Sequence, residues 1–166
     1  MKCRIIRVMR RVLGCLVLLG ASLTAQSNRE DKVAAFNKLK PVLTALKNAG
    51  ASRPSLTNQL AQTMLALANR DHPPSRPTVL AFADEFTYAL AGRDLWSAQL
   101  DALSQSIGEV VSGSTTNLKS ASRFREALTV MGVDAIKQQT LTKRFMAIGE
   151  EVRGPDDSPV FPVPIK

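Results

Sequence analysis

The spacing of its large apolar residues constrains the fold of this chain more than any other feature of the sequence. From Val33 onward, such residues recur every three or four positions, which is the repeat of one face of an α-helix. No stretch alternates apolar and polar residues for long enough to predict a strand, and β-branched residues never run together. Alanine and leucine, which favour helices, are plentiful. We therefore predict an all-α domain.

Capping residues, glycines and prolines divide the apolar pattern into six predicted helices. These helices span about residues 28–50, 52–70, 77–91, 94–111, 116–132 and 134–153. Pro41 lies inside the first helix and predicts a kink or a restart there. Asp94 is the predicted N-cap of the fourth helix. The apolar stripes expected to face the core include three residues near helix starts, Trp96, Leu118 and Ile136.

Three glycines indicate how the predicted helices pair. Gly50, Gly92 and Gly132 stand 42 and 40 residues apart, and each lies between two predicted helices. This period predicts three helical hairpins of about 40 residues, a length typical of helical-repeat units. We expect the hairpins to form a compact bundle, with a short helical-repeat array as the alternative arrangement.

The first 25 residues have the layout of a cleavable secretory signal peptide. Five basic residues and no acidic residue precede an uncharged, mostly apolar run, and small and polar residues then lead to Ala25. The run is too short to span a bilayer, which takes roughly 20 apolar residues. We predict a signal helix over residues 1–25, cleavage near Ala25, a helical domain over 26–154, and an extracytoplasmic location, either periplasmic or secreted.

Removing the signal peptide changes what the composition indicates. The whole chain has 22 basic and 14 acidic residues and a net charge of +8, whereas the part after Ala25 has 17 basic and 14 acidic residues, a net charge of +3. Both cysteines, Cys3 and Cys15, also lie in the signal peptide. The mature domain can therefore form no disulfide, and its weak basicity does not predict nucleic-acid binding.

Residues 155–166 differ in character from the rest of the chain. Four of the nine prolines lie in this segment, and proline disfavours helix interiors, so we predict an extended Pro-rich tail. Phe161, Val163 and Ile165 occupy alternate positions and would give an extended tail one apolar face. That face predicts a strap over a groove of the tail's own domain or a docking segment for a partner. The alternative is a disordered end.

Residue types that carry catalysis or metal binding are scarce. His72 is the single histidine, and we expect it in an exposed loop rather than in a metal or catalytic site. Adjacent carboxylates such as Asp84 and Glu85 do not face each other on a helix, so we expect them to be solvated. Asp84 is also expected to hydrogen-bond to Tyr88, one turn further on. No cofactor and no metal are predicted.

The last two predicted helices concentrate positive charge. Between residues 116 and 149 only two acidic residues, Glu126 and Asp134, oppose the cations. If they project on one side, the cations would attract anionic lipid headgroups, cell-wall polymer or an acidic protein. The simpler interpretation is a solvated face. The cations of this candidate patch are Lys119, Arg123, Arg125, Lys137, Lys143 and Arg144.

Taken together, these features favour an exported, non-enzymatic helical protein that binds another envelope or secreted protein, or takes part in an assembly. The alternative is a peripheral binder of anionic lipid or cell-wall polymer that uses the basic last hairpin. An enzyme ranks third, because the mature chain is poor in histidine, cysteine and tyrosine. Nucleic acid is disfavoured as a partner by the predicted compartment.

Overall fold

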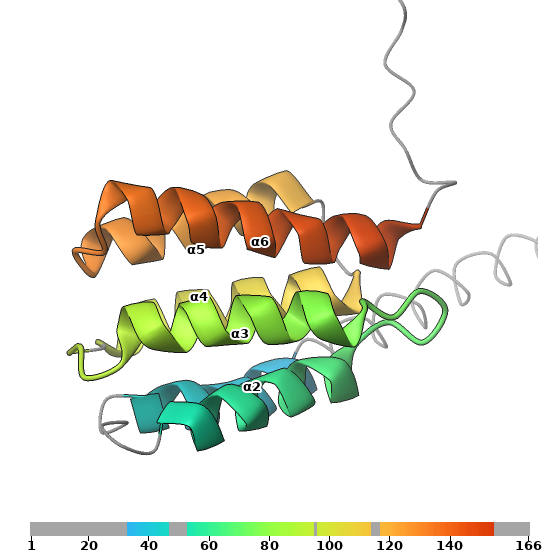
Figure 1. Cartoon of the computed structure of the whole chain (residues 1–166), viewed down its shortest axis with the longest axis horizontal. Coiled ribbons are helices and arrows are strands. Elements are labelled where there is room, and N and C mark those ends of the chain that lie inside the picture. Colours follow the sequence, from blue (N-terminus) through green and yellow to red (C-terminus); the bar gives the residue numbers. More distant parts are fainter. Residues whose placement is uncertain (1–32, 47–52, 95, 114–116, 155–166) are drawn as a thin grey trace, which may run out of the picture. The chain divides into compact units, whose positions relative to one another are not determined.

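The computed structural model of the protein describes residues 33–46, 53–94, 96–113 and 117–154 (Figure 1). Over these residues the chain forms six helices and no strand, which confirms the predicted all-α class. The chain divides into two units after Ala34, and the packing below is that of the second unit. None of the described helices is both long and apolar enough to cross a membrane. The helices are the first helix (33–45), α2 (Arg53–Leu67), α3 (Arg76–Leu90), α4 (Ser97–Ser112), α5 (Asn117–Val130) and α6 (Ala135–Arg153).

Helix α4 lies at the centre of the packing. It contacts α2, α5 and α6, while α3 packs against α2 and α6. In Figure 1, α3 and α4 accordingly form a layer between α2 on one side and α5 with α6 on the other. Because α4 is covered on several sides, even its polar residues Ser104 and Ser106 are fully buried. These are the contacts of a compact helical bundle.

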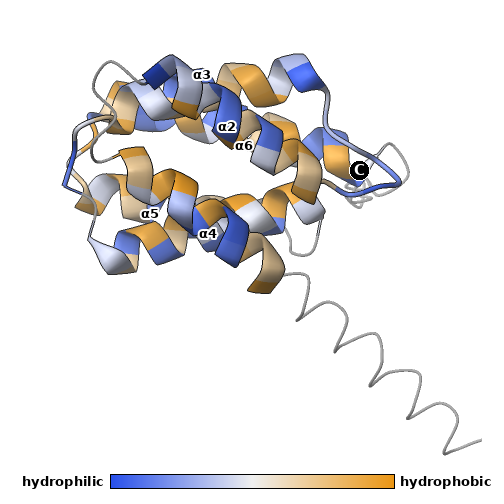
Figure 2. Ribbon diagram, turned by 90° about the horizontal axis from the view of Figure 1, so that it is seen from below, coloured by the Kyte–Doolittle hydropathy of each residue, from blue (hydrophilic) through white to orange (hydrophobic). Residues whose placement is uncertain are grey.

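Four phenylalanines from three helices fill the centre of the core. Phe82 and Phe86 of α3, Phe124 of α5 and Phe145 of α6 are fully buried, and the centroids of their contacting rings are 4.5–6.2 Å apart. Each aromatic side chain buries roughly 150–250 Å², so this cluster supplies a large share of the apolar area that holds α3, α5 and α6 together. Figure 2 shows the apolar residues on the sides of the helices that face one another.

The first helix packs closely against α4 at Gly108. A Cβ atom at this glycine would lie 3.0 Å from the Ala35 Cβ and 3.7 Å from a Leu39 methyl group. Any larger residue would push the two helices apart. At the surface, an ion pair of 2.8 Å between the Lys40 Nζ and the Asp101 carboxylate joins the same two helices.

The predicted helix ends are confirmed at two glycines and one aspartate. Gly92 and Gly132 follow α3 and α5 with φ angles of 73° and 68°, in the left-handed region that favours glycine. Asp134 is the N-cap of α6, and its Oδ1 accepts a hydrogen bond from the Lys137 N–H over 2.9 Å. Gly50, the third glycine of the predicted repeat, lies outside the described residues.

The structure differs from one other predicted boundary and narrows a second prediction. Helix α4 begins at Ser97 with Trp96 as its N-cap, so Asp94 does not cap it. Of the kink or restart predicted at Pro41, the restart is excluded, because the first helix continues through Pro41 to residue 45. Pro41 and Asn37, four residues earlier, are both exposed, so water can reach the Asn37 carbonyl that the proline cannot bond.

Four residues assigned to the apolar stripes are exposed instead. The exposed fractions are 53% for Val33, 67% for Trp96, 77% for Leu118 and 79% for Ile136. Trp96 is the extended N-cap residue of α4, so helical spacing does not apply to it. Ile136 precedes Leu141 by five residues and Leu118 precedes Phe124 by six, which places them about 140° and 120° around their helices from those buried residues. The apolar spacing identified the right face further along each helix, but these starting residues do not lie on it.

Candidate functional site

Two turns of the chain and the end of the first helix lie at the same end of the bundle, on the left in Figure 1. Successive helices run in opposite directions, which brings the end of the first helix next to the α3–α4 and α5–α6 turns. The Gly92 N–H donates to the Leu46 carbonyl over 3.1 Å and joins the first helix to the α3–α4 turn. We call this region the turn end, and it comprises Leu46, residues 88–94, Trp96 and residues 130–137.

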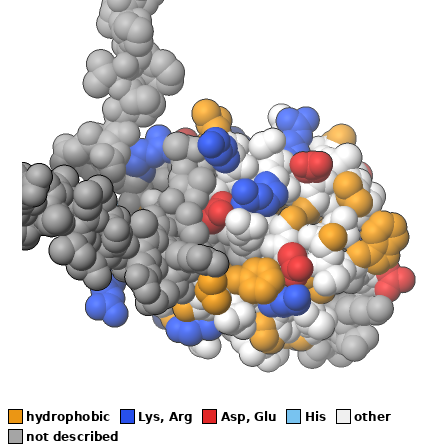
Figure 3. Space-filling model, turned by 180° about the vertical axis from the view of Figure 1, so that it is seen from behind, with side chains coloured by type: hydrophobic (Ala, Val, Ile, Leu, Met, Phe, Trp, Pro, Cys, Tyr) orange, Lys and Arg blue, Asp and Glu red, His pale blue; other side chains and the backbone are white. Residues whose placement is uncertain are grey.

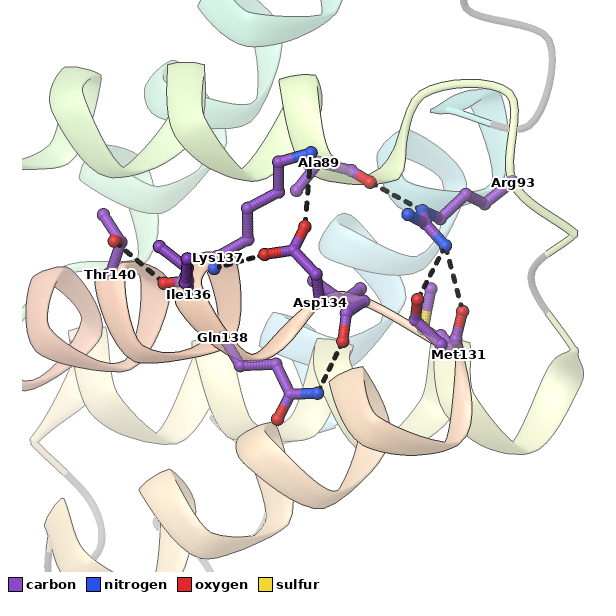
Figure 4. Close-up of polar contacts among 10 residues, drawn as sticks. Ala89, Arg93, Met131, Asp134, Ile136, Lys137, Gln138 and Thr140 are labelled. Carbon is purple, nitrogen blue, oxygen red and sulfur yellow. Dashed lines mark hydrogen bonds and ion pairs between the residues drawn. The ribbon is translucent and has the colours of Figure 1, made fainter.

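Arg93 joins the α3–α4 turn to the α5–α6 turn (Figure 4). Its Nε donates to the Ala89 carbonyl over 2.8 Å, and its Nη1 donates to the carbonyls of Met131 and Gly132, each over 3.2 Å. These carbonyls belong to the last turn of α3 and to the chain directly after α5, where the helical backbone leaves acceptors without a partner. The guanidinium also places a positive charge at the negative end of both helix dipoles.

Asp134 and Gln138 hold the start of α6 (Figure 4). The backbone N–H of Lys137 donates to Asp134 and, with the Lys137 ammonium 3.4 Å away, holds the pKa of the Asp134 carboxyl below its ordinary value. The Gln138 amide donates to the Val133 carbonyl over 2.6 Å and accepts from the Thr129 hydroxyl over 2.9 Å. Side chains of α5 and of the start of α6 therefore both hold the backbone of the α5–α6 turn in place.

Large apolar side chains are exposed on this fixed framework. In addition to Trp96 and Ile136, Tyr88 is 62% exposed and Val130 is 52% exposed. Tyr88 is in the last turn of α3, Trp96 is the N-cap of α4, Val130 ends α5 and Ile136 is in the first turn of α6. Four of the six large apolar residues exposed in the described chain thus belong to the turn end. Figure 3, seen from behind, shows hydrophobic side chains at this end, on the right, among side chains of both charges.

Two cations from neighbouring helices lie close to the Tyr88 ring. The Arg53 guanidinium, from the start of α2, is 5.3 Å from the centre of the Tyr88 ring, and the Lys137 ammonium of α6 is 5.6 Å from it. Arg53 also donates to the Asp84 carboxylate over 3.4 Å. The hydrogen bond expected between Asp84 and Tyr88 is therefore replaced by one between Asp84 and Arg53.

The structure places the six cations of the candidate patch in different surroundings. Arg123 forms an ion pair of 2.9 Å with Glu109, a carboxylate of α4 that is almost fully buried and also accepts from the Ser120 hydroxyl over 2.8 Å. Arg125 follows Arg123 by two residues and so points about 200° around α5 from it. Arg125 lines a shallow groove of about 370 Å³ between α5 and α6, with Ala135, Gln138, Gln139 and Thr142.

The remaining four cations are distributed along α5 and α6. Lys119 and Lys143 are exposed, and Lys137 belongs to the turn end beside Asp134 and Tyr88. Arg144 is partly buried, and its Nε has no hydrogen-bond partner. Arg123 and Lys137 thus already face carboxylates, while Lys119, Arg125, Lys143 and Arg144 have no ion pair within the described residues.

Several other predictions concern residues away from the turn end. His72 is exposed in the α2–α3 loop, as expected. Among the residues that the structure describes, no group of three histidine, cysteine, aspartate or glutamate side chains could hold a metal ion. The signal peptide over 1–25 and the tail residues Phe161, Val163 and Ile165 lie outside the described part of the chain.

No protein-family model, no curated protein and no solved structure matches this chain. The candidate site therefore depends on the geometry of the turn end alone. Sequence reasoning missed this site because it assigned Trp96 and Ile136 to the core. One signal was available: both residues precede the first buried residue of their stripes by four or five positions, at predicted helix starts.

Proposed function

We propose that this chain is an exported, non-enzymatic helical protein that binds another protein of the cell envelope, with the turn end as its binding surface. The observation that carries the proposal is the exposure of Tyr88, Trp96, Val130 and Ile136 on one end of the bundle. Tyrosine, tryptophan and arginine supply most of the binding energy in protein interfaces. A surface already fixed by Arg93 and Asp134 also loses little conformational entropy when it binds.

The charges at the turn end and directly beside it favour a protein over an anionic surface as the partner. Arg53 pairs with Asp84 and Lys137 pairs with Asp134. The Arg93 guanidinium donates its hydrogen bonds to backbone carbonyls. The surface thus presents both signs of charge around its apolar side chains. A protein of complementary mixed charge fits such a pattern, whereas attraction to anionic lipid or cell-wall polymer depends on uncompensated cations.

The proposal includes the predicted processing and organisation of the chain. Residues 1–25 would direct export and be removed near Ala25, and the mature domain would consist of three hairpins. The cationic start and short apolar run support the first statement. The positive φ angles of Gly92 and Gly132 in two equivalent turns support the organisation into hairpins.

Mass spectrometry of the protein from the envelope fraction is expected to find a chain that begins at about residue 26, and an uncleaved chain in the cytoplasm would contradict export.

Site-specific photo-crosslinking in cells tests the binding surface. A photoreactive phenylalanine analogue at Ile136 is expected to give a discrete protein adduct after irradiation. The matched control places the same analogue at Leu118, which is equally exposed but lies at the start of α5, at the other end of the bundle. Equal adducts from both positions, or none from Ile136, would contradict the proposal. Adducts of Ile136 with lipid alone would favour the peripheral membrane alternative.

A further inference from the structure

A groove between α2 and α3 has no role in the proposed binding surface. Its volume is about 230 Å³, which is below the roughly 300–1,000 Å³ of most small-molecule sites. Leu65 and Leu80 are only partly buried there, and Arg76 pairs with no carboxylate of the described residues. The groove is lined by Asn58, Ala61, Gln62, Leu65, Arg76 and Leu80.

The end of α6 stands next to this groove. The Glu151 carboxylate accepts hydrogen bonds from the Ser75 N–H and the Thr78 hydroxyl, each over 2.6 Å, at the start of α3. Three residues later, Gly154 turns with a φ of 74°, and a Cβ atom there would lie 3.1–3.2 Å from the His72 ring. Residues 155–166 therefore begin beside the α2–α3 loop, within a few residues of Arg76.

The order of residues in 155–166 matches the order of groups along the groove. Asp156 and Asp157 come first and carry the charge opposite to that of Arg76, which opens α3. Phe161 follows Asp157 by four residues, which span up to about 12 Å in an extended Pro-rich chain. Leu80 lies about 6 Å from Arg76 along α3, so Phe161 would reach Leu80 and Leu65. Twelve residues in that conformation extend about 37 Å, so the segment is longer than α2, at about 22 Å.

The amide side chains of the groove suit an extended backbone. Asn58 and Gln62 stand one turn apart on α2, about 6 Å along the helix axis. Two residues of an extended Pro-rich segment also span about 6 Å, and its carbonyls have no partners within the segment. The two amides therefore have the spacing needed to donate to alternate carbonyls of such a chain.

We propose that residues 155–166 of this chain dock in its own α2–α3 groove, with Asp156 and Asp157 beside Arg76 and Phe161 against Leu65 and Leu80. The occupant is covalently tethered, so the groove faces it at an effective concentration in the millimolar range. A small groove with three apolar residues, one cation and two amides is sufficient for contact at that concentration. This inference is independent of the turn end and of its proposed partner.

Photo-crosslinking within the full chain tests the docking. A photoreactive phenylalanine analogue replaces Phe161, which preserves the ring, and the crosslinked residues are mapped by mass spectrometry. We expect crosslinks within one chain to α2 and α3 at the groove, and none to the α5–α6 groove around Arg125 and Gln139, which serves as the internal control. Crosslinks to a second copy, crosslinks elsewhere in the domain, or the absence of any crosslink would overturn the proposal.

A charge exchange tests the contact with Arg76. Restoration by the opposite charges distinguishes a lost contact from a groove that no longer folds. Arg76→Glu is expected to lower the yield of the groove crosslink several-fold, because it repels Asp156 and Asp157. Adding Asp156→Lys and Asp157→Lys to that variant is expected to restore the yield. Arg125→Glu is the matched control and should leave the yield unchanged. Loss of yield in Arg76→Glu without restoration, or no loss at all, would contradict the proposed contact.

Discussion

At both ends of the bundle a charged side chain bonds backbone groups at the end of a neighbouring helix, but the two ends differ in the apolar residues that they expose. At the turn end, the cation of Arg93 binds carbonyls at the C-termini of α3 and α5. At the opposite end, the anion of Glu151 binds the N-terminus of α3. Both arrangements match the sign of the helix dipole. Only the turn end adds four exposed large apolar residues, whereas in α2–α6 the opposite end has Leu118 alone.

This difference separates stabilising networks from the proposed binding surface. A charged side chain that bonds backbone groups of a neighbouring helix is explained by the fold itself, because it satisfies helix ends that would otherwise lack partners. The exposure of Trp96 and Ile136 stabilises nothing within the domain, since apolar area left in water contributes no burial energy. Changes to Arg93 and Glu151 should therefore affect stability, and changes to Ile136 should affect binding alone.

The largest stability effect is expected at Arg93. Arg93→Ala removes three hydrogen bonds to carbonyls, two of them partly shielded from water, and we expect the free energy of unfolding to fall by about 2 kcal/mol. Urea denaturation followed by circular dichroism measures this change. Lys119→Ala, at an exposed cation of α5, is the control and should change stability by less than about 0.5 kcal/mol. Equal effects of the two substitutions would show that Arg93 does not join the turns.

A smaller effect is expected at Glu151, and it should depend on pH. Burial raises the pKa of this carboxyl, but hydrogen bonds from Thr78 and Ser75 outweigh burial and hold it below the ordinary value of 4.5. Glu151→Gln removes the charge and is expected to cost about 1 kcal/mol at neutral pH.

The pH dependence follows from the direction of that shift. A carboxyl whose pKa is lowered by folding stabilises the folded state above its unfolded value and loses this contribution as the pH falls through the folded value. The difference in stability between the wild type and Glu151→Gln should therefore be full above pH 4.5 and should shrink as the pH drops further below it. A difference that is the same at pH 6 and pH 3 would contradict the role of the ionised carboxylate.

The smallest stability effect is expected at the exposed apolar residues of both ends. Ile136→Ala and Leu118→Ala should each change the free energy of unfolding by less than about 0.5 kcal/mol, because both side chains are already in water. A loss above about 1 kcal/mol on Ile136→Ala would mean that this residue packs within the domain and is not free to bind a partner. Thermal unfolding of the two variants side by side provides the comparison.

The sequence predicts the helices and most of the core because both depend on local spacing. Leu141, Phe145 and Ile148 recur at helical intervals and are buried, and Gly132 ends its helix for a steric reason that holds in any fold. The turn end depends on contacts between distant residues. Arg93 bonds a carbonyl 38 residues away, and nothing in its local sequence specifies that partner.

The exposed residues illustrate a second limit. Trp96 and Ile136 have the same apolar character as the buried residues after them, but Trp96 is the extended N-cap of α4 and Ile136 lies about 140° around α6 from Leu141. Their exposure thus depends on the exact start of each helix, which the sequence pattern fixes least well. The pairing of Arg123 with the buried Glu109 is set by the packing of α5 on α4, so a count of cations along the chain does not reveal which of them are already paired.

The central claim, that the turn end binds a protein of the envelope, is tested most directly at the single tryptophan. Trp96 is the only one in the chain, so labelling with 5-fluorotryptophan gives one fluorine resonance without background from other proteins. Envelope protein extract from the producing cell is expected to shift or broaden this resonance in the wild type and in Leu118→Ala, but not in Ile136→Glu. An unchanged wild-type resonance, or an equal response in Ile136→Glu, would contradict the account.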